Sequence, residues 1–354
     1  MRRAVVLTAA ATYIGTVVGA GFASGQEVLQ FFGLLGPWGL PAVAIALAGF
    51  AFFGYVIIEA GREVRATSHL SVLRHTTGRL APVFDVVTTF FLFGALAAMI
   101  AGAGSVLRQE FSVPWIVGAG LLALVTVITV LFGLRGVITA ISAVVPFLIA
   151  AVLAVSLAVL YMRGPALQSP PPTYHAAVAS WPLAGVTYIS YNIVMSVPVL
   201  ASLGGALQSR REAGWGAAVG AFGLGLSLFL VYIALVSSFP DVLSYEVPMA
   251  YLASTVHRAG GPFYTAVFLA EVYTTAVANL YGFSARLARQ GSPAFLATTV
   301  LAGAAGLWAA SAGFSTLVHV LYPAVGWVGL ALLCALLIHY FRQNAISRRT
   351  RWGR

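Results

Sequence analysis

Apolar runs long enough to cross a lipid bilayer recur along all 354 residues of the chain. A membrane-spanning helix needs about 20 predominantly apolar residues. Hydrophobic residues make up 60% of this chain and charged residues only 8%, whereas soluble globular proteins carry about 25% charged residues. No stretch remains for a separate soluble domain. The sequence therefore predicts an all-α membrane protein that folds as a single transmembrane domain over residues 1–354.

Glycines, prolines and charged residues divide the apolar runs into ten expected transmembrane helices. The expected spans are 4–34, 39–61, 83–108, 114–132, 136–162, 177–207, 214–238, 262–285, 293–311 and 315–341. An even number of spans places both termini on the same side of the membrane. The basic start runs into the first span without a small-residue cleavage site, so no removable signal peptide is expected.

Arginine supplies all of the positive charge, because the 19 basic residues include no lysine and the net charge is +10. Only Arg108, Arg163 and Arg258 fall in loops on one side of the expected topology, and the other arginines lie at the termini and in loops on the opposite side. The positive-inside rule then predicts a prokaryotic plasma (inner) membrane protein with both termini in the cytoplasm. The arginines form no aromatic-interleaved stripe, so nucleic acid is not an expected partner. The lone Cys334 lies in an apolar run and allows neither an internal disulfide nor a cysteine-based metal cluster.

The segments between the spans also carry signals. Residues 62–79 mix arginines with apolar residues and predict a short amphipathic helix on the cytoplasmic surface. Three consecutive prolines predict an extended outer linker over 164–175. This linker would separate a first five-helix repeat, 1–163, from a second, inverted repeat, 176–342, which is followed by a basic cytoplasmic tail, 343–354.

The first span is expected to break. Its string YIGTVVGAGFASGQEVLQFF contains four glycines, and each costs about 1 kcal/mol inside a helix. Ser24 and Glu27 have the spacing of a capping box, which starts a new helix. A break near Gly19–Ala23 follows, and free backbone groups in a membrane are tolerated where they line a cavity. Glycine-mediated close packing of helices is the alternative interpretation.

The sixth span offers a counterpart in YISYNIVMSVPVLASLGG, with Ser190 and Asn192 near its middle and the helix-interrupting Pro198 beyond them. Paired interrupted helices in two inverted halves indicate a transporter site. Tyr188 and Tyr191 suit either solute contact or aromatic packing.

Glu271 lies near the middle of the eighth span, where a carboxylate must be neutralised by a proton, a cation or a basic group. Thr274 and Thr275 follow within about one helical turn and would surround it with oxygen ligands that suit Na⁺. The alternative is a protonated, hydrogen-bonded glutamic acid. Glu59 and Asp85 lie near arginines at the cytoplasmic ends, which favours structural ion pairs, and a packing role is favoured for His319.

The chain resembles the amino acid–polyamine–organocation transporters of the LeuT fold, and more closely the bacterial YkvI-type membrane proteins. The resemblance is carried by VGAGFASGQEVLQFF in the first span, IEAGREVR at the end of the second and SYN in the sixth. It implies two inverted five-helix repeats, with helices 1 and 6 broken at mid-membrane. It also implies a solute site whose carboxylate-binding part lies near residues 19–25, and support of the broken helices by Glu27 and Glu59. The implied solute site comprises Gly19, Ala20, Gly21, Phe22, Ser24, Gly25, Tyr188, Ser190 and Asn192.

The resemblance further implies a coupling-ion site for Na⁺ between the first and eighth helices. Its ligands would be the carbonyls of Gly15 and Val18 and the side chains of Thr274 and Thr275. Glu271 is a departure at this place, because relatives often supply only a carbonyl there. It could strengthen Na⁺ binding or replace Na⁺ by H⁺.

The expected function is cation-coupled symport of a small, amino-acid-like solute by alternating access, with Na⁺ favoured and no other cofactor. A proton-coupled carrier and a receptor that keeps the fold without transporting are the alternatives. An enzyme is not expected, because the spans show no paired aspartates, His cluster or Ser/His arrangement, and a channel is not favoured because no ring of charges is visible.

Overall fold

The computed structural model describes residues 3–66, 69–132 and 135–352, and within these ranges the chain forms helices and no strand. Nine of the helices in this part of the chain are long and apolar enough to cross a membrane. The helices are α1 (Arg3–Val17), α2 (Ala20–Ser24), α3 (Gln26–Phe31), η1 (Gly33–Trp38), α4 (Gly39–Glu63), α5 (His69–Thr77), η2 (Gly78–Leu80), α6 (Ala81–Phe111), α7 (Trp115–Phe132), α8 (Arg135–Arg163), α9 (Trp181–Ala206), α10 (Arg210–Val236), η3 (Asp241–Ser244), α11 (Pro248–Val256), α12 (Gly260–Leu287), α13 (Pro293–Ala310) and α14 (Phe314–Trp352).

The first expected span is not a single helix. It is divided into α1, α2 and α3, and the chain leaves helical geometry at Val18 and Gly19 and again at Gly25, whose φ is +79°. A positive φ costs glycine little because it has no Cβ. The sequence correctly indicated an interruption at Gly19, but the expected stretch of unwound chain is too long, since Ala20–Ser24 forms the short helix α2.

The expected capping box at Ser24 and Glu27 is wrong. Gly25, not Ser24, is the residue before α3, and it makes no side-chain cap. The Ser24 hydroxyl instead accepts from the Gln26 N–H at 3.0 Å and donates to the Gly21 carbonyl at 2.6 Å. The carboxylate of Glu27 is thereby left for a different partner.

The expected break in the sixth span is also wrong, because α9 runs without interruption from Trp181 to Ala206. Two of its polar side chains bond to carbonyls of their own helix. Asn192 Nδ2 donates to the Tyr188 carbonyl at 3.0 Å, and Ser196 Oγ donates to the Asn192 carbonyl at 2.6 Å. Such bonds satisfy polar groups inside a helix without unwinding it, and membrane helices tolerate proline when neighbouring groups satisfy the freed backbone.

The segments between the spans agree more closely with what the sequence predicts. Helix α5 lies within the segment expected to be amphipathic, and no helix forms between Arg163 and Trp181, where the proline-rich linker was expected. Helix α14 continues to Trp352, beyond the expected end of the last span and into the expected basic tail.

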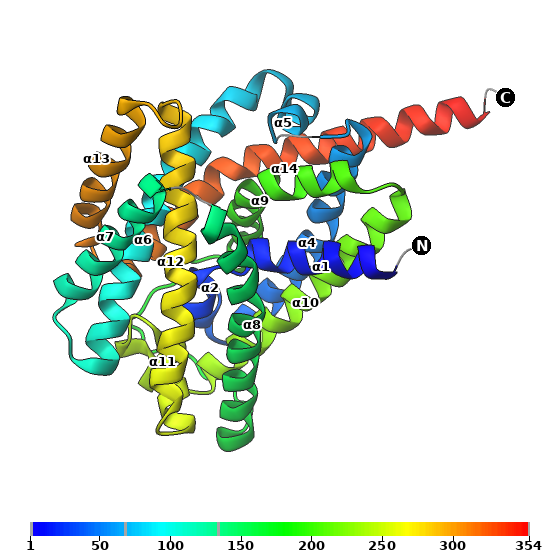
Figure 1. Cartoon of the computed structure of the whole chain (residues 1–354). Helices are drawn as coiled ribbons and strands as arrows, with labels where there is room; N and C mark the ends of the chain where they lie inside the picture. The colour runs from blue at the N-terminus through cyan, green and yellow to red at the C-terminus, as the bar shows by residue number, and fades with distance from the viewer. Residues whose placement is uncertain (1–2, 67–68, 133–134, 353–354) are drawn as a thin grey trace.

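The long helices pack as two groups (Figure 1). One group consists of α1, α4, α9 and α10, and the other of α6, α7, α12 and α13, while α8 and α14 contact members of both. Small residues allow α4 and α9 to approach closely: a Cβ placed on Gly204 would lie 2.1 Å from the Ile58 carbonyl oxygen. Close backbone contact through small residues is the usual way for membrane helices to associate.

Candidate functional site

A cavity of about 100 Å³ lies where the two helix groups meet. The interrupted first span, α6, α9, α12 and α14 all contribute to its walls. It is lined by Thr16, Val17, Gly19, Ala20, Gly21, Glu27, Phe91, Ala95, Met99, Tyr191, Asn192, Met195, Thr275, Asn279 and Tyr322.

Backbone of the interrupted span forms one wall. Gly19 lies between α1 and α2 in extended geometry, and no atom comes within 4 Å of the position that a Cβ on Gly19 would take. Gly21, by contrast, is tightly surrounded: a Cβ there would lie 2.5 Å from Glu27 Oε2 and 3.0 Å from the Tyr322 hydroxyl. The N–H groups that begin a helix have no partner within it, so this wall can donate hydrogen bonds.

The carboxylate of Glu27 lies in the same cavity and is only 4% exposed. The hydroxyl of Tyr191, on α9, donates a hydrogen bond to Glu27 Oε1. No basic residue is present among the described residues that line the cavity. From the sequence, Glu27 is expected only to support the broken helix, although it is the sole acidic residue within the first apolar run. That isolation was the signal that could have assigned it to the site.

Aromatic rings form another part of the cavity lining. The ring centroid of Tyr322 lies 5.1 Å from that of Tyr191 and 5.5 Å from that of Phe91. Met99 and Met195 complete this apolar part of the lining. Tyr188 is placed one layer further out, where its ring packs against Phe31, Phe32, Phe50 and Tyr191. Tyr188 does not line the cavity, so of its two expected roles the structure shows aromatic packing.

The other expected solute-site residues are divided. Gly19, Ala20, Gly21 and Asn192 line the cavity, whereas Phe22, Ser24, Gly25 and Ser190 do not. Ser190 Oγ faces the other way and donates to the Gly326 carbonyl of α14 at 2.6 Å. A Cβ on Gly25 would lie 2.8 Å from Met249 Cγ of α11, so that glycine is packed against another helix.

The expected coupling-ion residues of α12 lie beside the cavity. Thr275 lines it and donates from Oγ1 to Glu271 Oε1 at 3.2 Å, while Thr274 Oγ1 donates to the Glu271 backbone carbonyl at 3.0 Å. Glu271 Oε2 is buried without a hydrogen-bond partner in the part of the chain that the structure describes. A buried polar atom without a partner is costly, so this oxygen suits a proton or a small cation.

The two backbone carbonyls expected as ion ligands, those of Gly15 and Val18, belong to residues that do not line the cavity. Gly15 belongs to α1, and Val18 is in the gap that follows, with its N–H bonded to the Ile14 carbonyl at 2.8 Å. Helix α12 packs against α2, the segment directly after this gap. Neither Gly15 nor Val18 lines the cavity.

Glu59 has a different neighbourhood from the one expected. Its carboxylate accepts from Arg62 Nη2 at 2.7 Å and Arg62 Nε at 2.9 Å, and Arg210 Nε lies 3.7 Å away. The contact with Arg210 joins α4 to the start of α10. The expectation that Glu59 supports an unwound sixth helix is therefore wrong. Helix α9 is continuous, and Glu59 pairs with Arg62 and Arg210.

Two other polar residues occupy structural positions. Asp85 Oδ1 of α6 pairs with Arg286 Nη1 of α12 at 2.6 Å, which joins two helices of the same group. His319 Nδ1 lies 2.7 Å from Gln30 Oε1. Near it, Gln26 Nε2 donates to Ser315 Oγ, so a short polar chain joins α3 to α14.

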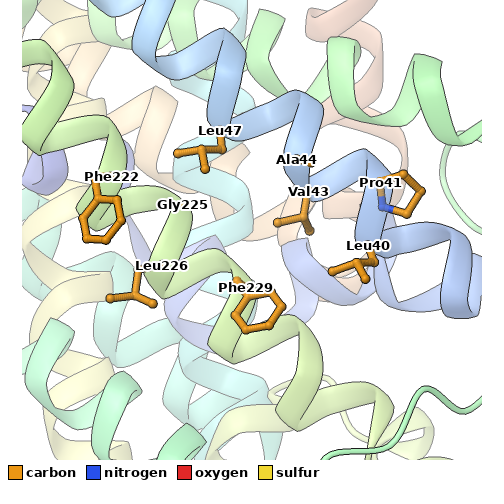
Figure 2. Close-up of a pocket in the computed structure, with 9 residues that line it drawn as sticks. All are labelled: Leu40, Pro41, Val43, Ala44, Leu47, Phe222, Gly225, Leu226 and Phe229. Carbon is orange, nitrogen blue, oxygen red and sulfur yellow. The ribbon is translucent and has the colours of Figure 1, made fainter.

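A larger hollow of about 510 Å³ lies between α4 and α10 but is entirely apolar (Figure 2). Its lining is Leu40, Pro41, Val43, Ala44, Leu47, Phe222, Gly225, Leu226 and Phe229. Several of these side chains are exposed, including Phe222 at 66%. A hollow without polar groups cannot orient a polar solute, so this hollow is not the candidate solute site.

Two curated proteins from Bacillus subtilis (strain 168) are similar to the chain over most of its length. The uncharacterized protein YyaD is 32% identical over 340 residues, which cover 92% of this chain and 94% of YyaD. The uncharacterized membrane protein YkvI is 28% identical over 340 residues, with 92% and 93% covered. No protein-family model matches the chain.

Solved transporter structures share its fold. MhsT in complex with L-phenylalanine aligns with a TM-score of 0.58 at 16% identity, covering 96% of this chain and 98% of MhsT. A Na⁺-coupled sialic acid symporter aligns with a TM-score of 0.58 at 14% identity, covering 86% and 72%. Mhp1 in its inward-facing conformation aligns with a TM-score of 0.56 at 13% identity, covering 94% and 75%.

These structures are LeuT-fold transporters, and together with the nine apolar helices of the described chain they show a multi-pass membrane protein of that fold. At these identities the likeness shows the fold of the chain. The resemblance to YkvI-type proteins is confirmed as well. The chain belongs to the family of bacterial membrane proteins that includes YyaD and YkvI.

Proposed function

We propose that this protein is a cation-coupled symporter of a small, amino-acid-like solute that works by alternating access, with Na⁺ as the preferred coupling ion. One observation carries the proposal. A single cavity between the two helix groups brings together interrupted backbone, a buried carboxylate and the hydroxyl of Thr275 that binds Glu271. A solute held there contacts both groups, so its binding is sensitive to how they are arranged.

The cavity suits a solute that carries an amino group. The carboxylate of Glu27 supplies negative charge, and the rings of Tyr191 and Tyr322 offer π faces that attract a cation. The backbone N–H groups near Gly19 and Gly21 would receive the solute carboxylate. The volume of about 100 Å³ favours a small side chain on that solute.

Glu271 supports the cation coupling. Its partnerless Oε2 and the Thr275 hydroxyl bonded to its Oε1 supply oxygen ligands of the kind that suits Na⁺. Because Thr275 also lines the cavity, an ion at Glu271 would influence the solute through one shared side chain. The same carboxylate favours H⁺ as the alternative coupling ion, since a proton on Oε2 would equally neutralise it.

On the α11 side of the interrupted first span, hydrogen bonds join the helices. Tyr264 of α12 donates to the Ala23 carbonyl, Gln26 donates to Ser315 of α14, and Gln109 Nε2 of α6 donates to the Val247 carbonyl before α11 at 3.1 Å. Under the expected orientation, with cytoplasmic termini in a prokaryotic plasma membrane, this is the outer side. Transport would require these contacts to open while others form on the opposite side.

Thermal stabilisation of the purified protein tests the proposal, because a ligand that binds only the folded state raises apparent stability. Amino acids and small amines are screened with Na⁺, with K⁺ and across pH, and hits are followed by uptake into proteoliposomes. We expect a solute that stabilises only with Na⁺ and accumulates when a Na⁺ gradient is imposed. Stabilisation that follows pH and ignores Na⁺ would indicate H⁺ coupling, and saturable binding without accumulation would indicate a receptor.

A further inference from the structure

Three side chains of metal-ligating type meet at one end of the helix bundle, outside the solute cavity. Glu63 is the last residue of α4, His75 lies in α5 and His339 lies in α14. One ligand atom from each side chain lies within 4.8 Å of the other two. We propose that Glu63, His75 and His339 form a binding site for a divalent transition-metal ion of the Zn²⁺ class.

Helix packing brings these residues together. Val72 of α5 packs in a small apolar cluster with Ala60 of α4 and Ala201 of α9. His75 follows Val72 by three residues, so the two lie on the same face of the helix. Helix α5 also contacts α14 (Figure 1), and the rings of His75 and His339 meet edge to face with centroids 4.8 Å apart.

The ligand types select the class of metal. Two imidazole nitrogens and a carboxylate are a known ligand set for Zn²⁺, with a fourth position left for water. Mg²⁺ and Ca²⁺ prefer oxygen ligands throughout, so the two histidines disfavour them. Tetrahedral ligands about 2.1 Å from Zn²⁺ are about 3.4 Å from each other. Glu63 and His75 are exposed at their helix surfaces, so side-chain rotation can shorten the present separations.

An unsatisfied ring nitrogen distinguishes this cluster from ordinary histidine packing. Nε2 of His339 is buried and has no hydrogen-bond partner among the residues that the structure describes. Leaving such a group unpaired costs free energy. A metal ion held by His339 and His75 would remove that cost. An aromatic contact between the two rings leaves the nitrogen without a partner and does not remove it.

Arginines adjoin two of the three ligands in the sequence. Arg62, directly before Glu63, places its guanidinium on Glu59 through two hydrogen bonds. Its positive charge is therefore offset by a neighbouring carboxylate. Arg74, directly before His75, is exposed, and solvent and salt screen exposed charges.

A bound ion would fix α4 and α5 to α14. Helix α4 belongs to the group that contains α1, α9 and α10, whereas α14 contacts both groups. The ion would oppose relative movement of these helices, so we expect Zn²⁺ to slow uptake. This consequence rests on the proposed transport function, but the binding site itself does not.

Metal binding is measured on the full chain, purified in detergent with no polyhistidine tag and stripped with chelator. Zn²⁺ affinity is obtained by competition with a chromophoric chelator, and Co²⁺ absorption reports nitrogen ligation in a tetrahedral site. We expect one ion per chain. His75→Ala and His339→Gln should each weaken binding by about tenfold or more, and Glu63→Gln should also weaken it. His175→Ala, which removes an exposed histidine elsewhere, should not.

Unchanged Zn²⁺ affinity in both His75→Ala and His339→Gln, or no stoichiometric binding by the native chain, would overturn the proposal. Size-exclusion profiles and circular dichroism of each variant establish that it is folded. Because His75 is exposed, its alanine variant is expected to keep the fold and so provides the decisive comparison. Failure of transport with intact metal binding would count against the proposed function and leave the metal site standing.

Discussion

Tyr191 donates its phenolic hydrogen to the carboxylate of Glu27, a residue 164 positions earlier in the chain. This bond connects α9 with α3 at the wall of the cavity, beside the interruption at Gly19. It therefore couples the shape of the interrupted first span to a continuous neighbouring helix.

Glu27→Gln is expected to abolish stabilisation by amino-group-bearing solutes, because the neutral amide cannot balance their charge. Tyr191→Phe should weaken solute affinity by about tenfold, as expected for a lost hydrogen bond to a charged group. Tyr232→Phe is the matched control, since that buried hydroxyl donates to the Gly36 carbonyl at 2.7 Å and lies outside the cavity lining. If Tyr191→Phe and Tyr232→Phe change affinity equally, Tyr191 has no direct role. Thermal shift and equilibrium binding give these values.

Two neighbouring glycines should respond differently to the same substitution. Gly19→Ala places its methyl group in open space, so we expect an unchanged melting temperature and weaker solute binding. Gly21→Ala forces the methyl group against Glu27 Oε2 and the Tyr322 hydroxyl, and overpacking of this kind costs about 1–3 kcal/mol. Its melting temperature should fall together with binding. Equal stability of the two variants in denaturation experiments would contradict this assignment of the cavity.

Glu271→Gln is expected to remove the dependence of solute binding on the coupling cation. The amide can accept the hydrogen bond from Thr275 but supplies no charge to a cation. Thr275→Val should reduce apparent Na⁺ affinity and, through the shared wall, solute affinity. Thr299→Val is the control, because Thr299 is buried in α13 and donates to the Phe295 carbonyl of its own helix at 2.8 Å. Na⁺-dependent uptake that persists in Glu271→Gln would return Glu271 to a structural role.

Glu59→Gln should reduce stability while leaving solute binding intact. The carboxylate is 7% exposed and bonds twice to Arg62, and losing a partner of a buried charged group costs about 1–3 kcal/mol. Asp241→Asn breaks the more exposed pair with Arg163, for which we expect less than about 1 kcal/mol. A fall in solute affinity for Glu59→Gln, measured by the same binding assay, would show that this end of α4 influences the site.

The sequence by itself determined which segments are apolar enough to cross the membrane and where the first of them is interrupted. Both properties are local. Membrane insertion depends on the summed hydrophobicity of about 20 consecutive residues, and the break at Gly19 and Gly25 follows from the backbone freedom of glycine. The family resemblance was also readable in the first-span motif, because that motif is contiguous.

The tertiary structure alone decided which residues form the cavity. Phe91 and Tyr322 carry no local signal that distinguishes them from packing residues, and they line the site because α6 and α14 meet the interrupted first span there. The continuity of α9 was also decided by the tertiary structure. The polar side chains of Asn192 and Ser196, which suggested a break, donate hydrogen bonds to carbonyls of the same helix. Glu27 lines the cavity, where its carboxylate accepts a hydrogen bond from Tyr191, a residue distant in sequence. Contacts between distant segments arise from packing geometry, which a linear pattern of residue types does not specify.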